Sequence, residues 1–282
     1  MPLSVSVFGL GLMGRPIART LIAKGFPVQG WNRSPLKPDL TAGIPIAASL
    51  QDAARADVCL LILADSAAVA AVVDQLEGYL RQNQTVLDMG TSDPDASRLH
   101  AQRLSSKEIR WVDAPVSGGP EGAASGGLAI MAGGTAEDVA RVRPVLEALG
   151  SNVVRVGGPG AGHVTKLINQ VIVGLTIEAV AEGLALAERS GIDPTLVQQA
   201  LRGGFADSKV LQIHGTRMIS RAFVPGGKAA THLKDLQLAL RLARQAGLSL
   251  PHLESTLALY QRLVDLGRGN EDHSALHALL TA

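Results

Sequence analysis

The chain opens with Leu3-Ser-Val-Ser-Val-Phe8-Gly9-Leu10-Gly11-Leu12-Met13-Gly14, an apolar run that passes directly into a glycine-rich turn. The run predicts a buried strand, and residues 16–24 after the turn have helical periodicity. A GxGxxG turn between a strand and a helix is typical of dinucleotide binding, because its glycines permit a tight turn and the close approach of a pyrophosphate. Free N–H groups at the helix start then favour the phosphates. A glycine-rich turn without a ligand is the alternative.

The same alternation continues through the first 160 residues. Apolar runs typical of strands alternate with helical stretches such as 67–80, and the runs lie at 27–31, 58–63, 85–88, 109–113, 128–131 and 152–156. Strands that alternate with helices predict a parallel, doubly wound sheet. The direction of the last two strands does not follow from the pattern.

The character of the sequence changes after about residue 160. No convincing strand follows, Asp193-Pro194 is typical of a helix start, and residues 234–246 and 251–266 are strongly amphipathic. We therefore predict an α/β protein with an N-terminal Rossmann domain in residues 1–160. An all-α C-terminal domain would occupy residues 161–282, and a long helix around 163–188 would join the two.

Composition restricts the class of protein. The 282 residues are 46% hydrophobic and 18% charged with a net charge of +1, which is typical of a soluble globular protein and argues against a nucleic-acid partner. A single cysteine, Cys59, excludes an internal disulfide, and its apolar run predicts an inert, buried thiol. The seven histidines show no metal-ligand spacing, and His163 and His232 are expected to be packed polar side chains.

A cytoplasmic location without a membrane partner is expected. The N-terminus enters a strand directly and lacks the charged segment of a signal peptide. The helix around residues 163–188 is apolar enough to raise the question of a membrane span. It carries Asn169, Gln170, Glu178 and Glu182, however, so a core helix of a soluble protein is the better interpretation.

The end of the second predicted strand bears on the choice of dinucleotide. An NAD site usually presents a carboxylate there to the ribose, whereas this chain has Trp31-Asn32-Arg33-Ser34. Arg33 can bind a 2′-phosphate through charge-assisted hydrogen bonds, with Asn32 and Ser34 as further donors. The residues favour NADP(H) over NAD(H), and a solvated arginine at a strand end is the alternative.

Two further segments carry polar groups that suit a small anionic substrate. Lys166, in Gly160-Ala-Gly-His-Val-Thr-Lys166, is the sole lysine or arginine between Arg155 and Arg189. A buried lysine can act as an acid or base, although it can also extend to water from the first helical turn. Ser117-Gly118-Gly119 follows a strand and offers backbone N–H groups and a hydroxyl as a cradle for a carboxylate, or it is a flexible loop.

Taken together, these segments resemble the β-hydroxyacid dehydrogenase family, which includes 3-hydroxyisobutyrate dehydrogenase and tartronate semialdehyde reductase. The resemblance covers the whole chain and rests on residues 9–14, 113–119, 160–170 and 232–236, in the family's order. The stretch from Phe223-Val-Pro-Gly-Gly to Lys234-Asp235, and Asp272-His-Ser-Ala-Leu276, look most like the tartronate semialdehyde reductase branch.

The resemblance implies roles for matching positions. Lys166 would be the catalytic acid and base, Asn169 would hydrogen-bond the substrate, and Ser117, Gly118 and Gly119 would hold its carboxylate. Gln170 stands where relatives often have a second asparagine, so either amide is a candidate. The implied cofactor contacts are Gly9, Leu10, Gly11, Leu12, Met13, Gly14, Asn32, Arg33, Ser34, Leu63, Ala64, Thr91, Lys234 and Asp235, with Leu63-Ala64 in the place of the family's usual Leu-Pro pair.

The family resemblance leaves alternatives. A reductase of 3-hydroxyisobutyrate's semialdehyde, succinic semialdehyde, glyoxylate or sulfolactaldehyde would use the same residue types, and relatives form homodimers or homotetramers. An imine reductase shares the architecture but usually lacks the lysine, and 6-phosphogluconate dehydrogenase has a longer helical region. A catalytically silent dinucleotide-binding protein is the non-enzyme alternative, which the intact lysine, amide and Ser-Gly-Gly set argues against.

Overall fold

The computed structural model describes residues 2–281 and divides into two compact units. The first ends at Lys166 and the second begins at Leu167, so the boundary lies inside helix α7 (Ala161–Arg189). The first unit contains the whole sheet, and the second is helical.

The sheet of the first unit has the strand order β2-β1-β3-β4-β5-β7-β6, with β8 paired to β7. Its first five strands are parallel and in register, and they are β1 (Val5–Phe8), β2 (Val28–Trp31), β3 (Val58–Leu61), β4 (Thr85–Asp88) and β5 (Arg110–Asp113). The order reverses at β1, which lies between β2 and β3, and ligands of doubly wound sheets bind at such a point. The prediction of an α/β Rossmann sheet followed by helices is confirmed.

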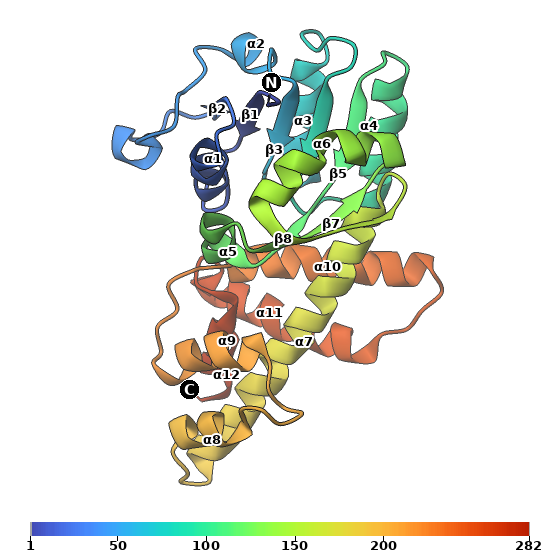
Figure 1. Cartoon of the computed structure of the whole chain (residues 1–282). Coiled ribbons are helices and arrows are strands. Elements are labelled where there is room, and N and C mark those ends of the chain that lie inside the picture. Colours follow the sequence, from blue (N-terminus) through green and yellow to red (C-terminus); the bar gives the residue numbers. More distant parts are fainter. Residues whose placement is uncertain (1, 282) are drawn as a thin grey trace. The chain divides into compact units, whose positions relative to one another are not determined.

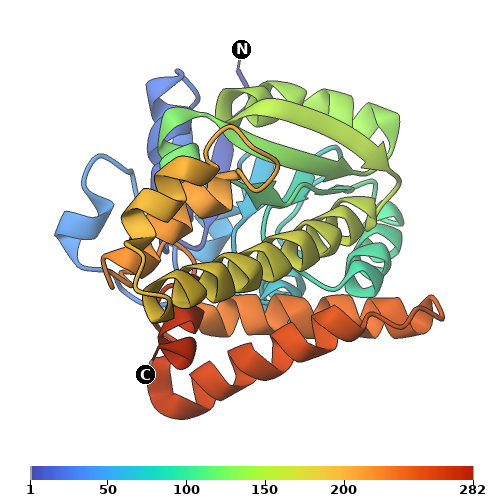
Figure 2. The ribbon, with the colours of Figure 1, turned by 90° about the horizontal axis from the view of Figure 1, so that it is seen from below.

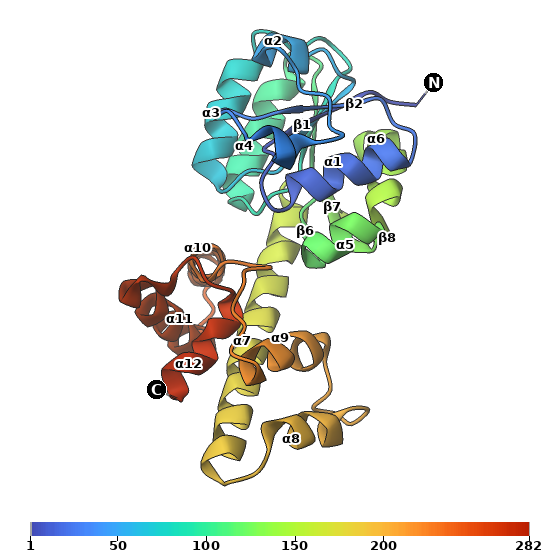
Figure 3. The same cartoon turned by 90° about the vertical axis from the view of Figure 1, so that its left-hand side faces the viewer.

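Both faces of this sheet are covered by helices, as Figure 3 shows for α1 (Gly14–Ala23) and α6 (Ala136–Leu149) on one face and α3 (Ser66–Leu76) and α4 (Pro94–Ser105) on the other. Successive strand residues point to opposite faces. Leu60 therefore packs in the core with α1 and α6, whereas its neighbour Leu61 packs with α3 and α4. Burial on both faces explains the continuous apolar runs of the sequence.

The edge of the sheet beyond β5 is mixed. Strand β7 (Leu128–Gly133) runs antiparallel to β5 and parallel to β8 (Gly150–Gly157). The sequence pattern missed β6 (Val116–Ser117), which pairs antiparallel with β7. Two residues are too few to show a period of two. This strand leads into α5 (Gly119–Ser125) and so fixes the start of the Ser117-Gly118-Gly119 turn.

The second unit is built around the remainder of α7. Figure 3 shows α10, α11 and α12 on one side of α7 and α8 and α9 on the other, and Figure 2 shows α10 and α11 side by side. The helices after α7 are α8 (Pro194–Leu201), α9 (Lys209–Ile219), α10 (Ala229–Gln245), α11 (Pro251–Leu263) and α12 (His277–Leu280). The Asp193 carboxylate caps α8 through the Thr195 N–H, as the sequence predicted. Within the described part of the chain, no strand follows β8.

Helix α7, which Figure 1 shows in yellow-green, is long and apolar enough to cross a membrane by length and composition alone. Leu167, Ile177, Ala181 and Leu184 of this helix belong to the apolar core of the second unit. A helix in the core of a globular unit meets the same criterion as a membrane span, and about a third of this apolar stretch is buried, so packing explains part of its composition.

Cys59 provides a test of the sheet. Its side chain is fully buried in β3, and burial raises the pKa of the thiol to about 12. Because the thiolate is the reactive form, we expect an aromatic disulfide reagent to label the native protein no faster than the protein unfolds. Labelling at the rate of a free thiol, without denaturant, would contradict the position of β3. Labelling in denaturant gives the reference rate.

Candidate active site

The glycine turn between β1 and α1 is built by close backbone contacts. Gly9 has a φ of +99°, and a Cβ at this position would lie 2.5 Å from the carbonyl oxygen of Ile62. A Cβ on Gly14 would overlap the carbonyl oxygen of Gly9, so the first helical turn approaches β1 as closely as backbone allows. A Cβ on Gly11 would meet nothing within 4 Å, and Gly11 is exposed. The turn thus has an open backbone side, which fits a pyrophosphate.

The other members of this turn differ in exposure. Leu10 is buried in the core beneath the turn, Leu12 is exposed, and Met13 is half-buried. The Leu10 N–H donates to Oδ1 of Asn32 at 3.1 Å, and Nδ2 of Asn32 donates to the Ser34 carbonyl at 2.7 Å. The Asn32 amide therefore ties the end of β2 to the glycine turn, a role that the sequence pattern did not reveal.

Five of the predicted cofactor positions follow the ends of neighbouring parallel strands. Arg33 and Ser34 come after β2 and are exposed, whereas Leu63 and Ala64 come after β3. Thr91 follows β4 and is half-buried. Because β1 to β4 are parallel and adjacent, their carboxyl ends lie at one edge of the sheet, together with the glycine turn. The structure thus brings these predicted positions of the first unit to one edge.

The Ser117-Gly118-Gly119 turn has a backbone that requires its glycines. Gly118 and Gly119 have φ values of +136° and +65°, and a Cβ on Gly118 would lie 3.2 Å from Leu128. Ser117 is half-buried and Gly118 is exposed. Glu121 places a carboxylate in the first turn of α5, which opposes anion binding there. An anion cradle would therefore depend on the Ser117 hydroxyl and the adjacent N–H groups.

Lys166 lies in the second turn of α7 and is only 8% exposed. Asn169 and Gln170 follow it by three and four residues, which places both amides on the same face of the helix. A lysine in such surroundings keeps its charge only where polar groups solvate it. The side chain is thus an enclosed ammonium group with amides one turn away, rather than a cation that extends freely into water.

In the second unit, Gln170 and Asp235 are joined. Nε2 of Gln170 donates to Oδ2 of Asp235 at 2.6 Å, and Nδ2 of Asn169 donates to Oε1 of Gln170 at 2.9 Å. Nζ of Lys234 forms an ion pair with Oδ1 of Asp235 at 3.0 Å. Both ends of the Gln170 amide therefore have partners within the unit.

The structure adds a buried pair of carboxylates at the start of α7 that the sequence reasoning missed. Oδ1 of Asp113 accepts from the Gly160 N–H at 2.7 Å, and its Oδ2 accepts from the His163 N–H at 3.0 Å. Oδ2 of Asp88 contacts Nε2 of His163 at 3.2 Å and accepts from the Ser92 hydroxyl. Asp88, Asp113 and His163 are all fully buried.

The two carboxyls respond differently to this burial. Burial raises the pKa of Asp113 above its ordinary value, because desolvation outweighs the charge of His163 and the two backbone donors. Burial also acts to raise the pKa of Asp88, but the hydrogen bond and charge of His163, with the Gly90 and Ser92 donors, hold that pKa below its ordinary value. Asp113 opens the 113–119 motif, but the motif does not reveal its partners, and Asp88 lies in none of the motifs noted above, since the contacts join β4, β5 and α7.

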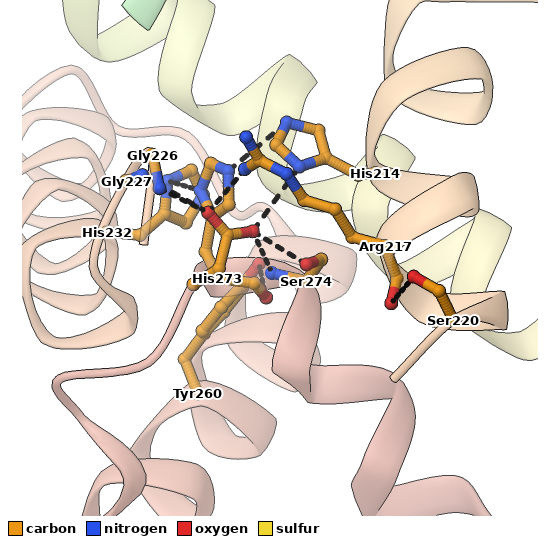
Figure 4. A network of polar contacts seen from close by, with 10 residues as sticks. His214, Arg217, Ser220, Gly226, Gly227, His232, Tyr260, His273 and Ser274 are labelled. Atoms are coloured by element: carbon orange, nitrogen blue, oxygen red, sulfur yellow. Dashed lines mark hydrogen bonds and ion pairs between the residues drawn. The ribbon is translucent and has the colours of Figure 1, made fainter. Parts of the chain in front are cut away.

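A second buried carboxylate organises the second unit. Asp272 is fully buried, and Nη1 of Arg217 donates to its Oδ2 at 2.6 Å. Figure 4 shows the rings of His214, His232 and His273 gathered beside Arg217. The Gly226 and Gly227 N–H groups and the Ser274 hydroxyl and N–H also donate to the carboxylate.

The polar contacts of Asp272 hold residues 272–276 next to the 223–227 loop. Both stretches look like the tartronate semialdehyde reductase branch. The Asp272 N–H donates to the Phe223 carbonyl at 3.0 Å, and the His273 N–H donates to that of Gly227 at 2.8 Å. His214 and His273 offer nitrogen atoms close to the carboxylate, which is a ligand set that could hold a metal ion. Donors already occupy both carboxylate oxygens, so the geometry better fits an anchor for the 223–227 loop.

Comparison with known proteins decides the family. Residues 4–158 match the NAD-binding domain of 6-phosphogluconate dehydrogenase, and residues 160–280 match the NAD-binding region of NADP-dependent 3-hydroxyisobutyrate dehydrogenase. The chain belongs to the β-hydroxyacid dehydrogenase family. The chain is 37% identical over 279 residues to 2-hydroxy-3-oxopropionate reductase of Escherichia coli, covering 97% of this chain and 96% of that one.

Solved structures with the same fold accompany these sequence matches. A 3-hydroxyisobutyrate dehydrogenase from Salmonella typhimurium superposes with a TM-score of 0.89 at 29% identity, over 98% of this chain and 99% of the other. A protein called Psf3, in complex with NADP⁺ and 2-OPP, has a TM-score of 0.89 at 25% identity with the same coverage. The predicted family and enzyme class are confirmed: the protein is a dehydrogenase or reductase of the CH–OH group that uses a nicotinamide dinucleotide.

The Asp272 carboxylate gives a prediction for stability. Burial acts to raise the pKa of Asp272, but the His214 contact, the charge of His273 and the Ser274 donors hold it far below its ordinary value. A depressed native pKa stabilises the fold fully above the unfolded pKa of about 3.9, and this contribution is lost as the pH falls below it. Asp272→Asn should lower the free energy of unfolding at pH 7 by roughly 3–5 kcal/mol.

Urea unfolding at pH 7 and at about pH 3.5, below the unfolded pKa, measures both effects. The wild type should lose more stability between these values than Asp272→Asn does. Asp265→Asn changes a carboxylate of the second unit that is not buried, and it is the matched control. An equal loss in wild type and Asp272→Asn would show that the Asp272 charge does not stabilise the unit.

Proposed function

We propose that this protein is an NADP(H)-dependent reductase of tartronate semialdehyde (2-hydroxy-3-oxopropionate), which interconverts a small β-hydroxy carboxylic acid and its semialdehyde. Similarity to the E. coli 2-hydroxy-3-oxopropionate reductase over nearly the whole length of both chains supports the substrate class. The observation that carries the chemistry is the burial of Lys166 near the start of α7, with two amides on the same helical face.

Lys166 is proposed as the general acid of the reduction. Its ammonium group would donate a hydrogen bond to the carbonyl oxygen of the aldehyde and then its proton to the alkoxide that forms there. In the oxidative direction the neutral amine would take the proton from the alcohol. A donor aimed at the oxygen that gains negative charge is commonly the largest electrostatic contribution to catalysis. A bound nicotinamide supplies or accepts the hydride.

The substrate carboxylate is proposed to bind at Ser117, Gly118 and Gly119, whose positive φ values expose backbone N–H groups. Fixing this end of the substrate would hold the carbonyl near the acid, and such positioning accelerates the reaction by itself. Of the two amides, Asn169 is the better candidate for a substrate contact. Gln170 is instead a link between Asn169 and Asp235, because both ends of its amide have partners.

The cofactor is proposed to bind along the carboxyl ends of the parallel strands. The backbone of Gly9–Gly14 would face the pyrophosphate, Arg33 the 2′-phosphate, and Thr91 the nicotinamide ribose. The exposed Arg33 and the missing carboxylate at the end of β2 support NADP(H) over NAD(H). Leu63, Ala64, Lys234 and Asp235 stay cofactor contacts on the strength of the family resemblance.

We also propose that residues 1–160 supply most of the cofactor contacts, with Lys234 and Asp235 as the exceptions, and that residues 161–282 form a substrate and oligomerisation domain. Exposed apolar side chains on α7 and α8, such as Ile172, Leu186 and Leu196, support a homodimer or homotetramer, which light scattering would measure. A cytoplasmic location is proposed from the likeness to soluble metabolic enzymes.

Other substrates would use the same residues. The semialdehyde of 3-hydroxyisobutyrate, succinic semialdehyde, glyoxylate and sulfolactaldehyde each combine an aldehyde with an anion. A panel of these with tartronate semialdehyde, each assayed with NADPH and with NADH, tests the proposal. Tartronate semialdehyde with NADPH should give the highest kcat/KM, and a higher value for another aldehyde acid would reassign the substrate.

Lys166→Ala is expected to reduce kcat for tartronate semialdehyde by about 10²–10⁴-fold, the usual contribution of a general acid. The dissociation constant of NADPH, measured by its fluorescence, should stay within about threefold, since binding depends on other groups. Lys24→Ala removes an exposed lysine after α1 and should leave turnover unchanged. Near-normal turnover of Lys166→Ala would refute the role of this lysine.

Arg33→Ala is expected to raise KM for NADPH by roughly 10–100-fold, because a hydrogen-bonded charge pair is lost. KM for NADH should change little. Arg33→Lys keeps the charge but not the planar pair of donors, so its KM for NADPH is expected to lie between those of the wild type and Arg33→Ala. Arg143→Ala, on the exposed face of α6, is the control. Equal effects on the two cofactors would rule out a 2′-phosphate contact at Arg33.

A further inference from the structure

We propose that Asp113 is a positioning residue for catalysis: its buried carboxylate fixes the first turn of α7 and thereby the place of Lys166. The inference rests on the proposed role of Lys166 as the acid. Asp113 is the last residue of β5, and its hydrogen bonds to the Gly160 and His163 N–H groups reach both sides of the helix start.

The contact takes the place of a helix cap. The first N–H groups of a helix have no partner within the helix, and a side chain just before it usually accepts them. Here the cap comes from a strand 47 to 50 residues earlier in the chain. A local cap stabilises a helix but leaves its direction free. A carboxylate fixed to the sheet joins the helix start to the sheet and holds it in one place.

The contact between the start of α7 and the sheet at Asp113, called the joint below, is close because of two glycines. A Cβ on Gly162 would overlap the Met131 carbonyl oxygen and lie 2.5 Å from that of Asp113. A Cβ on Gly133 would lie 2.6 Å from the Gly162 nitrogen and 2.7 Å from both carboxylate oxygens of Asp113. Backbone of α7 thus lies against backbone of β5 and β7. The helix has no space to move toward these strands, even by the width of a methyl group.

A second carboxylate holds the same turn from the neighbouring strand. Asp88, the last residue of β4, contacts the His163 ring, while Asp113 accepts from the His163 N–H. The Gly90 N–H and the Ser92 hydroxyl hold Asp88 in turn. His163 is therefore fixed at both its backbone and its ring, and Lys166 follows it by three residues, less than one helical turn.

This arrangement has a kinetic consequence. The acid must lie within hydrogen-bond distance of the substrate oxygen, and a displacement of about 1 Å can reduce a rate by about 100-fold. Cofactor binding depends on the glycine turn after β1 and on the end of β2, which Asp113 does not contact. Loosening the joint should therefore lower kcat while the affinity for NADPH stays unchanged.

The test compares Asp113→Asn and Asp113→Ala in the full chain, with tartronate semialdehyde and NADPH. An asparagine side chain has one acceptor oxygen and an NH₂ group that repels the second N–H, so it keeps only one of the two hydrogen bonds. We expect kcat to fall by about tenfold in Asp113→Asn and by about 100-fold in Asp113→Ala. KM and the dissociation constant of NADPH should stay within about threefold.

Two pairs of variants separate positioning from general loss of stability. Thr135→Ala removes the side-chain cap of α6, through the Asp138 N–H, in the same unit and should lower the unfolding temperature without changing kcat. Gly162→Ala disturbs the joint while Asp113 is intact, and it should reproduce the fall in kcat. Gly183→Ala is the matched control for Gly162→Ala on the same helix, because a Cβ at position 183 would meet nothing within 4 Å.

Amide hydrogen exchange gives a measurement that does not depend on the substrate. The His163 and Val164 amides should exchange at least about tenfold faster in Asp113→Ala, with amides near Leu184 unchanged. The proposal is overturned if these amides keep their protection, or if Asp113→Ala, Asp113→Asn and Gly162→Ala all retain wild-type kcat. A failure of the proposed function gives a different result. Lys166→Ala would then remain active, while the His163 and Val164 amides could still exchange faster in Asp113→Ala.

Discussion

The packing of the α7 start against the end of β5 and against β7 is the constraint on which the first unit depends. Burying a carboxylate without partners costs several kcal/mol, so Asp113 is stable there only because helix N–H groups meet it. Those N–H groups would be equally costly without the carboxylate. The Asp113 carboxylate and the helix N–H groups thus provide each other's hydrogen-bond partners. Both are satisfied only when the helix start packs against the sheet.

Three carboxylates that are fully buried in the described part of the chain, those of Asp88, Asp113 and Asp272, show that burial alone does not determine an acid's behaviour. Asp113 has backbone donors, and its pKa is raised. Asp88 has a histidine as well as a hydroxyl and a backbone donor, and its pKa is lowered. Asp272 has an arginine, nearby histidines and several backbone donors, and its pKa is also lowered. The sign of the shift follows the number and charge of the donors that each site supplies against desolvation.

The fold was largely predictable from the sequence because its signals are local. The apolar runs of β1 to β5 and the glycine turn at Gly9–Gly14 each lie in one continuous stretch, and periodicity with turn chemistry is enough to recognise them. Strand β6 was missed because a strand of two residues is too short to show an alternation of apolar and polar side chains. Helix α10 begins at Ala229, five residues before the predicted stretch, since His232 and Leu233 are buried by tertiary packing. Of the candidate site, the lysine, the amides and the Ser-Gly-Gly turn were visible as motifs.

The contacts that hold those residues were not visible. Asp113 pairs with residues about 50 positions later, and Asp272 joins Arg217, His214 and the N–H groups of a loop, all from other elements. His163 and His232 were expected to be packed polar side chains, which describes their burial but not their partners. Side chains that meet across a fold leave no spacing in the sequence, so this part of the site needs the structure.

The position of the unit boundary has a consequence for how such proteins can recombine. The two family models meet between residues 158 and 160, whereas the two compact units meet after Lys166. The first turns of α7 therefore belong to the second family segment by sequence and to the first unit by packing. An exchange of segments at residue 160 would transfer the lysine to a new sheet together with its helical unit. Such a hybrid could be functional only if the new sheet offered a carboxylate to receive the helix.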